Sequence, residues 1–241
     1  MSVHALARPL ALVDETVALR RCALYRNAFK GTAVSYPAAL LRFNAVAAWM
    51  LTHRVTVDVS TSGELDRALA AGIDPRRVVI CPRDGGVEPI RRAVKAGAAR
   101  FVVGSTRQIA HLVECADRIQ PVVVDLTRDT ADTLVSTVLA HRELDPIGLH
   151  CRIDDPDDGI GAAKLRETVV DMWRIRRERD IVLGRISLAG LDIGEWGLVP
   201  RILRRVAEAT DEVVGDTCAH NQYPRPALTV APRHSAFLPS G

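Results

Sequence analysis

The stretch Gly31-Thr32-Ala33-Val34-Ser35-Tyr36-Pro37 decides the expected fold. Its apolar run predicts a short buried strand that ends at Pro37, because proline lacks the backbone N–H that a sheet interior requires. Apolar residues then recur at helical spacing over residues 38–51, so we expect a helix there. Ser35 stands near the end of this strand. We therefore expect its side chain to face the functional mouth of the fold.

The same alternation of strand and helix continues along the whole chain. Short apolar runs rich in β-branched residues predict strands at 32–36, 55–59, 78–81, 101–104, 122–125, 147–153, 186–193 and 227–231. Helical spacing predicts helices at 62–71, 87–96, 107–118, 131–142, 162–179 and 199–214. Ser62 and Ser105 are expected to cap two of these helices, and Gly72 and Gly97 to end two of them.

Strands that are apolar almost throughout are typical of a parallel sheet buried on both faces. Eight such units in about 210 residues predict the α/β class and a closed (β/α)₈ TIM barrel. An open doubly wound sheet is the alternative, but no G-x-G-x-x-G pattern follows the first strand.

We expect a single domain. Residues 31–241 form the barrel, and residues 1–30 precede it as a strand and a helix. The apolar run at 9–13 represents the strand, and Asp14 is expected to cap a helix over 15–29. No C-terminal β-domain is expected.

Composition excludes several classes of function. The net charge is only +3 and aromatic residues are 4% of the chain, which disfavours a nucleic-acid partner. No apolar run reaches the roughly 18 residues that a membrane span needs, and the first residues lack a signal-peptide pattern. The five cysteines have no metal-site or disulfide spacing, so we expect a reducing, cytoplasmic setting.

In a TIM barrel the functional residues lie at the carboxyl ends of the strands. The polar and glycine positions that fall there are candidate site residues. They are Ser35, Asp58, Asp84, Ser105, Asp125, Arg152, Asp155, Gly194 and Arg233.

Several segments resemble, in order, a known family. Residues 57–79, Gly148-Leu149-His150-Cys151-Arg152-Ile153, Leu191-Asp192-Ile193-Gly194 and residues 228–234 are similar to motifs of pyridoxal-phosphate (PLP) decarboxylases. These are the alanine-racemase-like (fold type III) enzymes that act on diaminopimelate, ornithine and arginine, and the resemblance is closest to the diaminopimelate decarboxylases. It implies the same barrel, a PLP cofactor and amino-acid decarboxylation.

The resemblance also marks departures at the cofactor positions. Ser35 stands where the family has its Schiff-base lysine, and Arg152 where a histidine stacks on the ring. Gly194-Glu195-Trp196 replaces the phosphate-binding glycine run, Ala231 replaces the glutamate at the pyridine nitrogen, and His234 an arginine. Covalent PLP needs an amine, which serine lacks. Ser35, Asp58, His150, Arg152, Gly194 and Ala231 are therefore candidate positions of a degenerate ligand site.

These departures predict a barrel that has lost PLP catalysis and acts as a binding or regulatory protein. No cofactor is expected, or PLP if there is one. Expected partners are a small anionic ligand, a second copy of the chain, or an intact homologue. The alternative is an active PLP-dependent decarboxylase or racemase with a non-standard site, or a barrel with unrelated chemistry, so enzymatic activity stays open.

Three individual candidates have competing interpretations. Lys164 lies at the functional end and is either a relocated Schiff-base lysine or a solvated helix residue, whereas Lys30 and Lys95 lie elsewhere. Asp58 is either a cofactor-site carboxylate or a strand-end residue that bonds a neighbouring loop. Arg152 either binds an anion or pairs with Asp154 or Asp155.

Two further patterns have structural interpretations. His150 and Cys151 are adjacent on a strand and point to opposite faces, so they cannot act as a nucleophile–base pair. We expect a packed, hydrogen-bonded His150. The loop Asp154-Asp155-Pro156-Asp157-Asp158 lacks the glycine and distal glutamate of a calcium loop, which favours a solvated acidic loop over a cation site.

Overall fold

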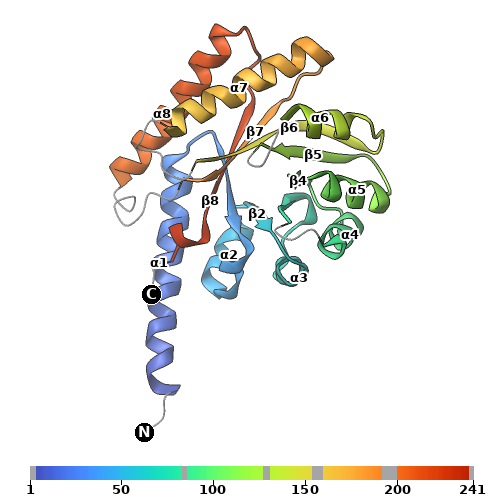
Figure 1. The fold of residues 1–241 in the computed structure, drawn as a ribbon. Helices are drawn as coiled ribbons and strands as arrows, with labels where there is room; N and C mark the ends of the chain where they lie inside the picture. Colours follow the sequence, from blue (N-terminus) through green and yellow to red (C-terminus); the bar gives the residue numbers. More distant parts are fainter. Residues whose placement is uncertain (1–3, 83–85, 127–130, 154–159, 192–199, 239–241) are drawn as a thin grey trace.

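A computed structural model describes residues 4–82, 86–126, 131–153, 160–191 and 200–238 (Figure 1). Within these residues, eight parallel strands close into a barrel in sequence order. The predicted (β/α)₈ barrel is thus confirmed, and the open-sheet alternative is wrong. The strands are β1 (Ala33–Pro37), β2 (Thr56–Val59), β3 (Val78–Ile80), β4 (Arg100–Val103), β5 (Gln120–Asp125), β6 (Leu144–Ile153), β7 (Arg185–Gly190) and β8 (Ala227–Pro232).

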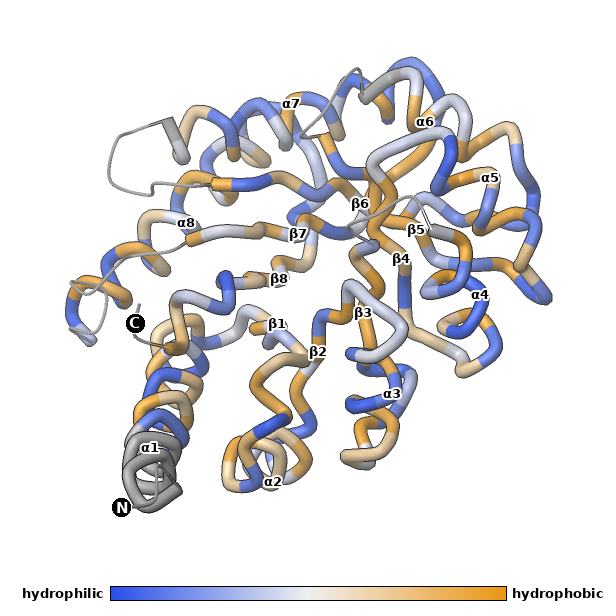
Figure 2. The backbone as a smooth tube through the Cα atoms, turned by 60° about the horizontal axis from the view of Figure 1, so that its bottom comes forward, coloured by the Kyte–Doolittle hydropathy of each residue, from blue (hydrophilic) through white to orange (hydrophobic). Residues whose placement is uncertain are grey.

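The helices surround the barrel, and apolar and polar residues alternate along them (Figure 2). Their buried apolar side chains belong to the hydrophobic core that packs against the strands. The α-helices are α1 (His4–Ala28), α2 (Asn44–Thr52), α3 (Ser62–Ala70), α4 (Val87–Ala96), α5 (Thr106–Cys115), α6 (Ala131–Leu139), α7 (Ile160–Arg179) and α8 (Pro200–His220). Short 3₁₀ turns are η1 (Ala38–Arg42), η2 (Pro75–Arg77) and η4 (His234–Ala236). The amino-terminal part of α1 projects beyond the barrel (Figure 1).

Three sequence predictions about residues 9–51 are wrong. Residues 9–13 are not a strand, and Asp14 is not a cap, because both lie inside the continuous helix α1. The single helix expected over 38–51 is instead η1 followed by α2, divided at Phe43, whose backbone is extended. Phe43 provides no side-chain cap for α2. Glu15 of α1 caps α2 instead, because its Oε1 accepts a hydrogen bond of 2.6 Å from the backbone N–H of Ala45.

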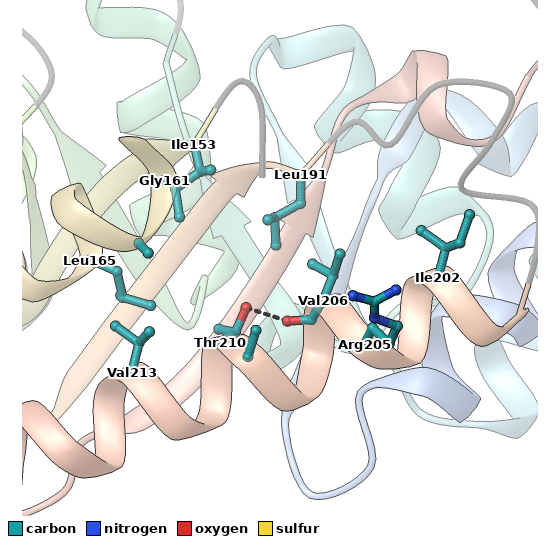
Figure 3. Close-up of a pocket in the computed structure, with 11 residues that line it drawn as sticks. Ile153, Gly161, Leu165, Leu191, Ile202, Arg205, Val206, Thr210 and Val213 are labelled. Carbon is teal, nitrogen blue, oxygen red and sulfur yellow. Dashed lines mark hydrogen bonds between the residues drawn. The ribbon is translucent and has the colours of Figure 1, made fainter. Parts of the chain in front are cut away.

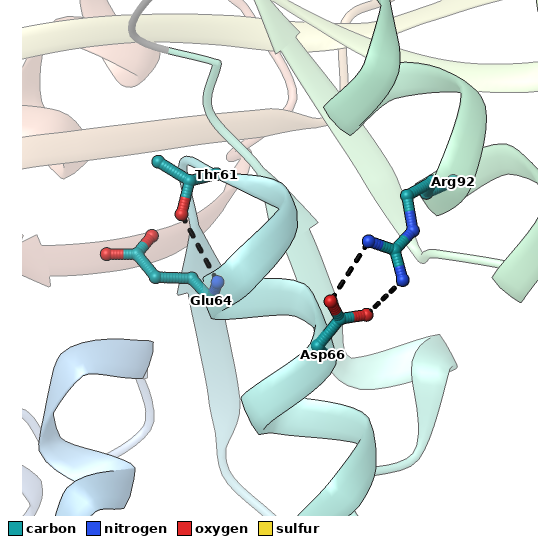
Figure 4. Close-up of polar contacts among 4 residues, drawn as sticks. All are labelled: Thr61, Glu64, Asp66 and Arg92. Atoms are coloured by element: carbon teal, nitrogen blue, oxygen red, sulfur yellow. Dashed lines mark hydrogen bonds and ion pairs between the residues drawn. The ribbon is translucent and has the colours of Figure 1, made fainter.

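The turns after β2 and β4 are fixed by helix caps. Thr61, rather than the predicted Ser62, caps α3, because its extended backbone lets Oγ1 accept from the N–H of Glu64 at 3.2 Å (Figure 4). Ser105 caps α5 as predicted, accepting from the N–H of Gln108. Arg92 of α4 pairs with Asp66 of α3, which ties neighbouring helices together outside the barrel (Figure 4).

The core has two parts of unequal size. Most large apolar side chains lie between the strands and the helices, where Leu40, Phe101 and Ile109 are completely buried. Inside the barrel the apolar cluster is small, formed by Val79, Val102 and Val123. The interior above this cluster is therefore open to polar side chains, and it is there that the candidate site lies.

Candidate functional site

A cavity of about 710 Å³ occupies the carboxyl end of the barrel. Its volume is within the range of small-molecule sites. Seven candidate residues predicted from the sequence line it, from four strands and from the segments after β4 and β8. They are Asp58, Ser105, Asp125, His150, Arg152, Ala231 and Arg233.

Ser35 lies beneath the cavity floor. The structure extends β1 to Pro37, which lines the cavity, so Ser35 is one inward position deeper and is only 1% exposed. The expectation that Ser35 faces the mouth directly is thus wrong. Its Oγ donates a hydrogen bond of 2.6 Å to Oδ1 of Asp58 on β2. Asp58 forms the floor above it and separates the serine from the cavity.

The pKa of the Asp58 carboxyl group is higher than usual. Burial raises its pKa to about 6, and the negative charge of Glu64 acts in the same direction. The hydrogen bond from Ser35 and the positive charge of Arg100 oppose this rise. The structure thus bonds Asp58 to Ser35 on the neighbouring strand, whereas one interpretation of the sequence gave Asp58 a loop as its partner.

His150 is packed and hydrogen-bonded, as predicted. It is 7% exposed, and its Nδ1 lies 3.0 Å from Oγ of Ser187 on β7. Burial lowers the pKa of His150, the charge of Arg152 lowers it further, and the charge of Asp125 raises it. Cys151 is buried on the outer face of β6, so the prediction that the two side chains do not cooperate is confirmed.

Arg152 is an exposed cation of the cavity wall. The strand register places it beside Ala189 of β7 and, one strand further, Ala231 of β8. Both neighbours are small, so they leave space in front of the guanidinium. Among the side chains that the structure describes, Arg152 has no hydrogen-bond or ion-pair partner. Asp154 and Asp155, its predicted partners, lie outside the described residues.

The structure adds residues that sequence reasoning missed. Cys81 lines the cavity, and burial together with the charges of Asp58 and Asp125 raises the pKa of its thiol well above the usual value. Gln108 accepts from the N–H of Gly104 and donates to the carbonyl of Pro82, which joins the segments after β3 and β4. Successive side chains of a strand point to opposite faces, so every second residue points into the barrel. Counting in steps of two from another inward-facing residue of the same strand identifies Cys81 and Ser187.

The three lysines of the chain are all within the described residues, and none lines the cavity. Lys164 is on α7, where its charge lowers the pKa of Cys151 on the outer face of β6, although burial keeps that pKa near 11. Lys30 follows α1 at the amino end of the barrel, and Lys95 is exposed on α4.

Some predicted positions lie outside the described residues: Asp84, the loop of residues 154–158, and Gly194-Glu195-Trp196. Within the described ranges there is no group of three or more metal-binding side chains. No helix in those ranges is both long enough and apolar enough to cross a membrane.

This geometry agrees with the relationship found by comparison with known proteins. The pyridoxal-binding domain of the pyridoxal-dependent decarboxylases matches residues 16–143. The chain belongs to this family. It is 35% identical to diaminopimelate decarboxylase of Mycobacterium tuberculosis over 123 residues, which are 49% of this chain and 28% of that protein. It is 24% identical to the diaminopimelate decarboxylase of Actinosynnema pretiosum over 97% of this chain and 59% of that protein.

Solved decarboxylase structures share the barrel. Diaminopimelate decarboxylase from M. jannaschii superposes with a TM-score of 0.75 at 17% identity, covering 93% of this chain and 60% of that one. The lysine/ornithine decarboxylase of Vibrio vulnificus, complexed with putrescine, gives 0.73 at 14% identity, covering 90% and 61%. The chain thus spans less than two thirds of the length of these relatives.

The described residues at two positions that the resemblance assigns to cofactor contacts do not fit covalent PLP. Ser35, at the position that the resemblance assigns to the Schiff-base lysine, provides a hydroxyl group that is already engaged by Asp58. Ala231, at the position of the glutamate that pairs with the pyridine nitrogen, presents only a methyl group to the cavity. The chain thus retains the barrel of the pyridoxal-dependent decarboxylase family, with a hydroxyl group and a methyl group at the two positions that the resemblance assigns to cofactor contacts.

Proposed function

We propose that this decarboxylase-family barrel binds a small anionic molecule in its mouth and does not carry out PLP chemistry. The observation that carries the proposal is the Ser35–Asp58 hydrogen bond. It uses the side chain at the lysine position for a structural contact below the cavity. An amine is required for the covalent attachment of PLP, and the three lysines lie outside the cavity.

Arg152 supports the choice of an anion. Its guanidinium is exposed in the cavity wall beside two alanines, and no described carboxylate neutralises it. Guanidinium groups bind carboxylate and phosphate through paired hydrogen bonds.

Incubation with PLP, followed by borohydride reduction and peptide mass spectrometry, tests the loss of cofactor chemistry. We expect no stoichiometric adduct on the wild-type chain, and no release of carbon dioxide from diaminopimelate, ornithine, arginine or lysine. The Lys164→Ala variant is the control for incidental labelling. A stoichiometric adduct on Lys164 that Lys164→Ala abolishes would show the proposal to be wrong.

Titration calorimetry with inorganic phosphate and with succinate tests the anion site separately. The Arg152→Gln variant should bind these anions at least about tenfold more weakly, since it loses a charged hydrogen-bond pair. Arg76→Gln is the matched control, because Arg76 is also exposed but lies in η2 at the opposite end of β3. Equal losses in both variants, or no binding by the wild type, would exclude Arg152 as the anchor.

One observation favours a second candidate function. Asp58, Asp125 and Arg152 all line the same cavity, which is the acid–base set that an active enzyme with a non-standard site would use. Turnover of any of the four amino acids, lost on Asp58→Asn and on Asp125→Asn substitution, would favour it over the binding protein.

We also propose a cytoplasmic location and, as partners, a second copy of the chain or an intact homologue. The five cysteines are free in the structure, which supports a reducing, cytoplasmic setting. Self-association and pairing with an intact homologue are measured by size-exclusion chromatography with light scattering, on the chain alone and on the mixture.

A further inference from the structure

A second cavity, of about 340 Å³, lies outside the barrel between α7 and α8 (Figure 3). It shares none of its described lining residues with the mouth. The alternation of the strands explains the separation. Arg152 and Gly190 line the mouth, whereas the next residues, Ile153 and Leu191, line this groove.

The walls of the groove are apolar. Leu165 of α7 and Val206 and Val213 of α8 face one another across it, and Ile153 and Leu191 close one side (Figure 3). The hydroxyl group of Thr210 donates to the carbonyl of Val206 at 2.8 Å. This donor is therefore satisfied within α8, and the groove floor favours an apolar chain.

The wall at Leu191 is held in place from outside the groove. The hydroxyl group of Tyr25 on α1 donates a hydrogen bond of 3.0 Å to the carbonyl of Leu191. The N–H of Leu191 in turn donates to the carbonyl of Ile153 at 2.8 Å. The two residues that form this side of the groove are therefore fixed to each other and to α1, as expected of a preformed site.

One end of the groove is positively charged. The guanidinium of Arg205 lies beside Val206 at that end (Figure 3). Arg205 is exposed, and within the part of the chain that the structure describes it has neither an ion-pair nor a hydrogen-bond partner. Arg201 and Arg204 are exposed on the same two turns of α8, so the local potential favours an anion.

We propose that this groove binds an amphipathic monocarboxylate, such as a medium-chain fatty acid. The apolar chain lies between α7 and α8, and the carboxylate binds the guanidinium of Arg205. An aliphatic amine with the same chain is excluded by repulsion from Arg205, and an alcohol lacks the charge that the arginine recognises. The site is independent of the mouth and of the function proposed for it.

Calorimetric titration of the full chain with decanoate tests this inference. We expect one molecule bound per chain, weaker binding of decanol, and none of decylammonium at the same concentrations. The Arg205→Gln variant should bind decanoate roughly tenfold more weakly. Arg204→Gln is the matched control, because Arg204 is adjacent and exposed but does not line the groove, so this variant should lose much less affinity for decanoate than Arg205→Gln.

A second variant tests the position of the alkyl chain of decanoate in the groove. Ala209 lines the groove from an exposed turn of α8, so Ala209→Trp should fill the cavity and abolish decanoate binding while the barrel stays folded by circular dichroism. Absence of decanoate binding to the wild type would overturn the proposal, as would equal losses in Arg205→Gln and Arg204→Gln. So would unchanged binding by a folded Ala209→Trp variant, or binding of decylammonium as tight as that of decanoate.

Discussion

Ser35 and Asp58 join the first two strands through a hydrogen bond of 2.6 Å beneath the mouth of the barrel. The serine is the donor, so the bond stabilises the ionised form of a carboxyl group that burial otherwise disfavours. The pair thus engages Ser35, which the resemblance places at the family lysine, in a structural contact, and it makes the stability of the barrel depend on pH.

Replacing Asp58 by asparagine should stabilise the protein at neutral pH. The folded pKa of Asp58, about 6, is above the ordinary value of 3.8, so folding favours the protonated form. The contribution of Asp58 to stability is full below pH 3.8 and is lost as pH rises through 6. Asp58→Asn should therefore raise the free energy of unfolding by on the order of 2 kcal/mol at pH 8 and change it little at pH 3.5. Urea unfolding at the two pH values measures this difference.

Replacing Ser35 by alanine removes the donor of the Ser35–Asp58 hydrogen bond. Ser35→Ala deletes the donor, so the pKa of Asp58 should rise further and the protein should lose roughly 1–2 kcal/mol at pH 8. The loss should be much smaller at pH 3.5, where Asp58 is protonated in the folded state. A loss of equal size at both pH values would mean that the serine acts only through packing.

The titration of His150 should respond to its two charged neighbours in opposite directions. Its pKa lies below 6.5 because of burial, and it is lowered by Arg152 and raised by Asp125. Arg152→Gln should therefore raise the pKa of His150, and Asp125→Asn should lower it. Proton–nitrogen NMR of the imidazole as a function of pH measures both shifts. The signals of His53 and His220, which do not line the cavity, serve as references and should not move between the variants.

Cys81 should react slowly with iodoacetamide although it lines the cavity. Burial and the charges of Asp58 and Asp125 raise its pKa, so little thiolate is present at pH 8. Asp58→Asn removes one of these charges and should speed alkylation by roughly three- to tenfold. Peptide mass spectrometry follows Cys81 and Cys115 in the same sample. The rate at Cys115 should be unaffected, and an equal acceleration at both cysteines would indicate general loosening.

Glu15 should contribute to stability through a helix that it does not belong to. Its carboxylate accepts from the N–H of Ala45 at the start of α2, so Glu15→Ala should cost about 1 kcal/mol. Glu15→Gln retains an acceptor and should cost less. Asp14→Ala, one residue earlier in α1, is the control and tests the cap that the sequence suggested. A larger loss from Asp14→Ala than from Glu15→Ala would contradict this assignment of the cap.

The sequence by itself determined the order of strands and helices, the closed barrel and the family. It did so because short, almost continuous apolar runs, helical apolar patterns, turn glycines and Ser105 are local signals that a chain carries without its partners. The match of 87–96 to α4, ended at Gly97 with a φ of 83°, illustrates how well such signals work. The motif order likewise indicated that Ser35, Arg152 and Ala231 replace cofactor contacts.

Only the tertiary structure decided what those residues touch. The depth of Ser35 in the barrel depends on the length of β1 and on its register with β2. The sequence of one strand alone predicts neither of these. The pairing of His150 with Ser187, the cap that Glu15 supplies to α2, and the groove that ends at Arg205 all join residues distant in sequence. Closure of the barrel brings them together, because each strand places alternate side chains inside and outside the sheet.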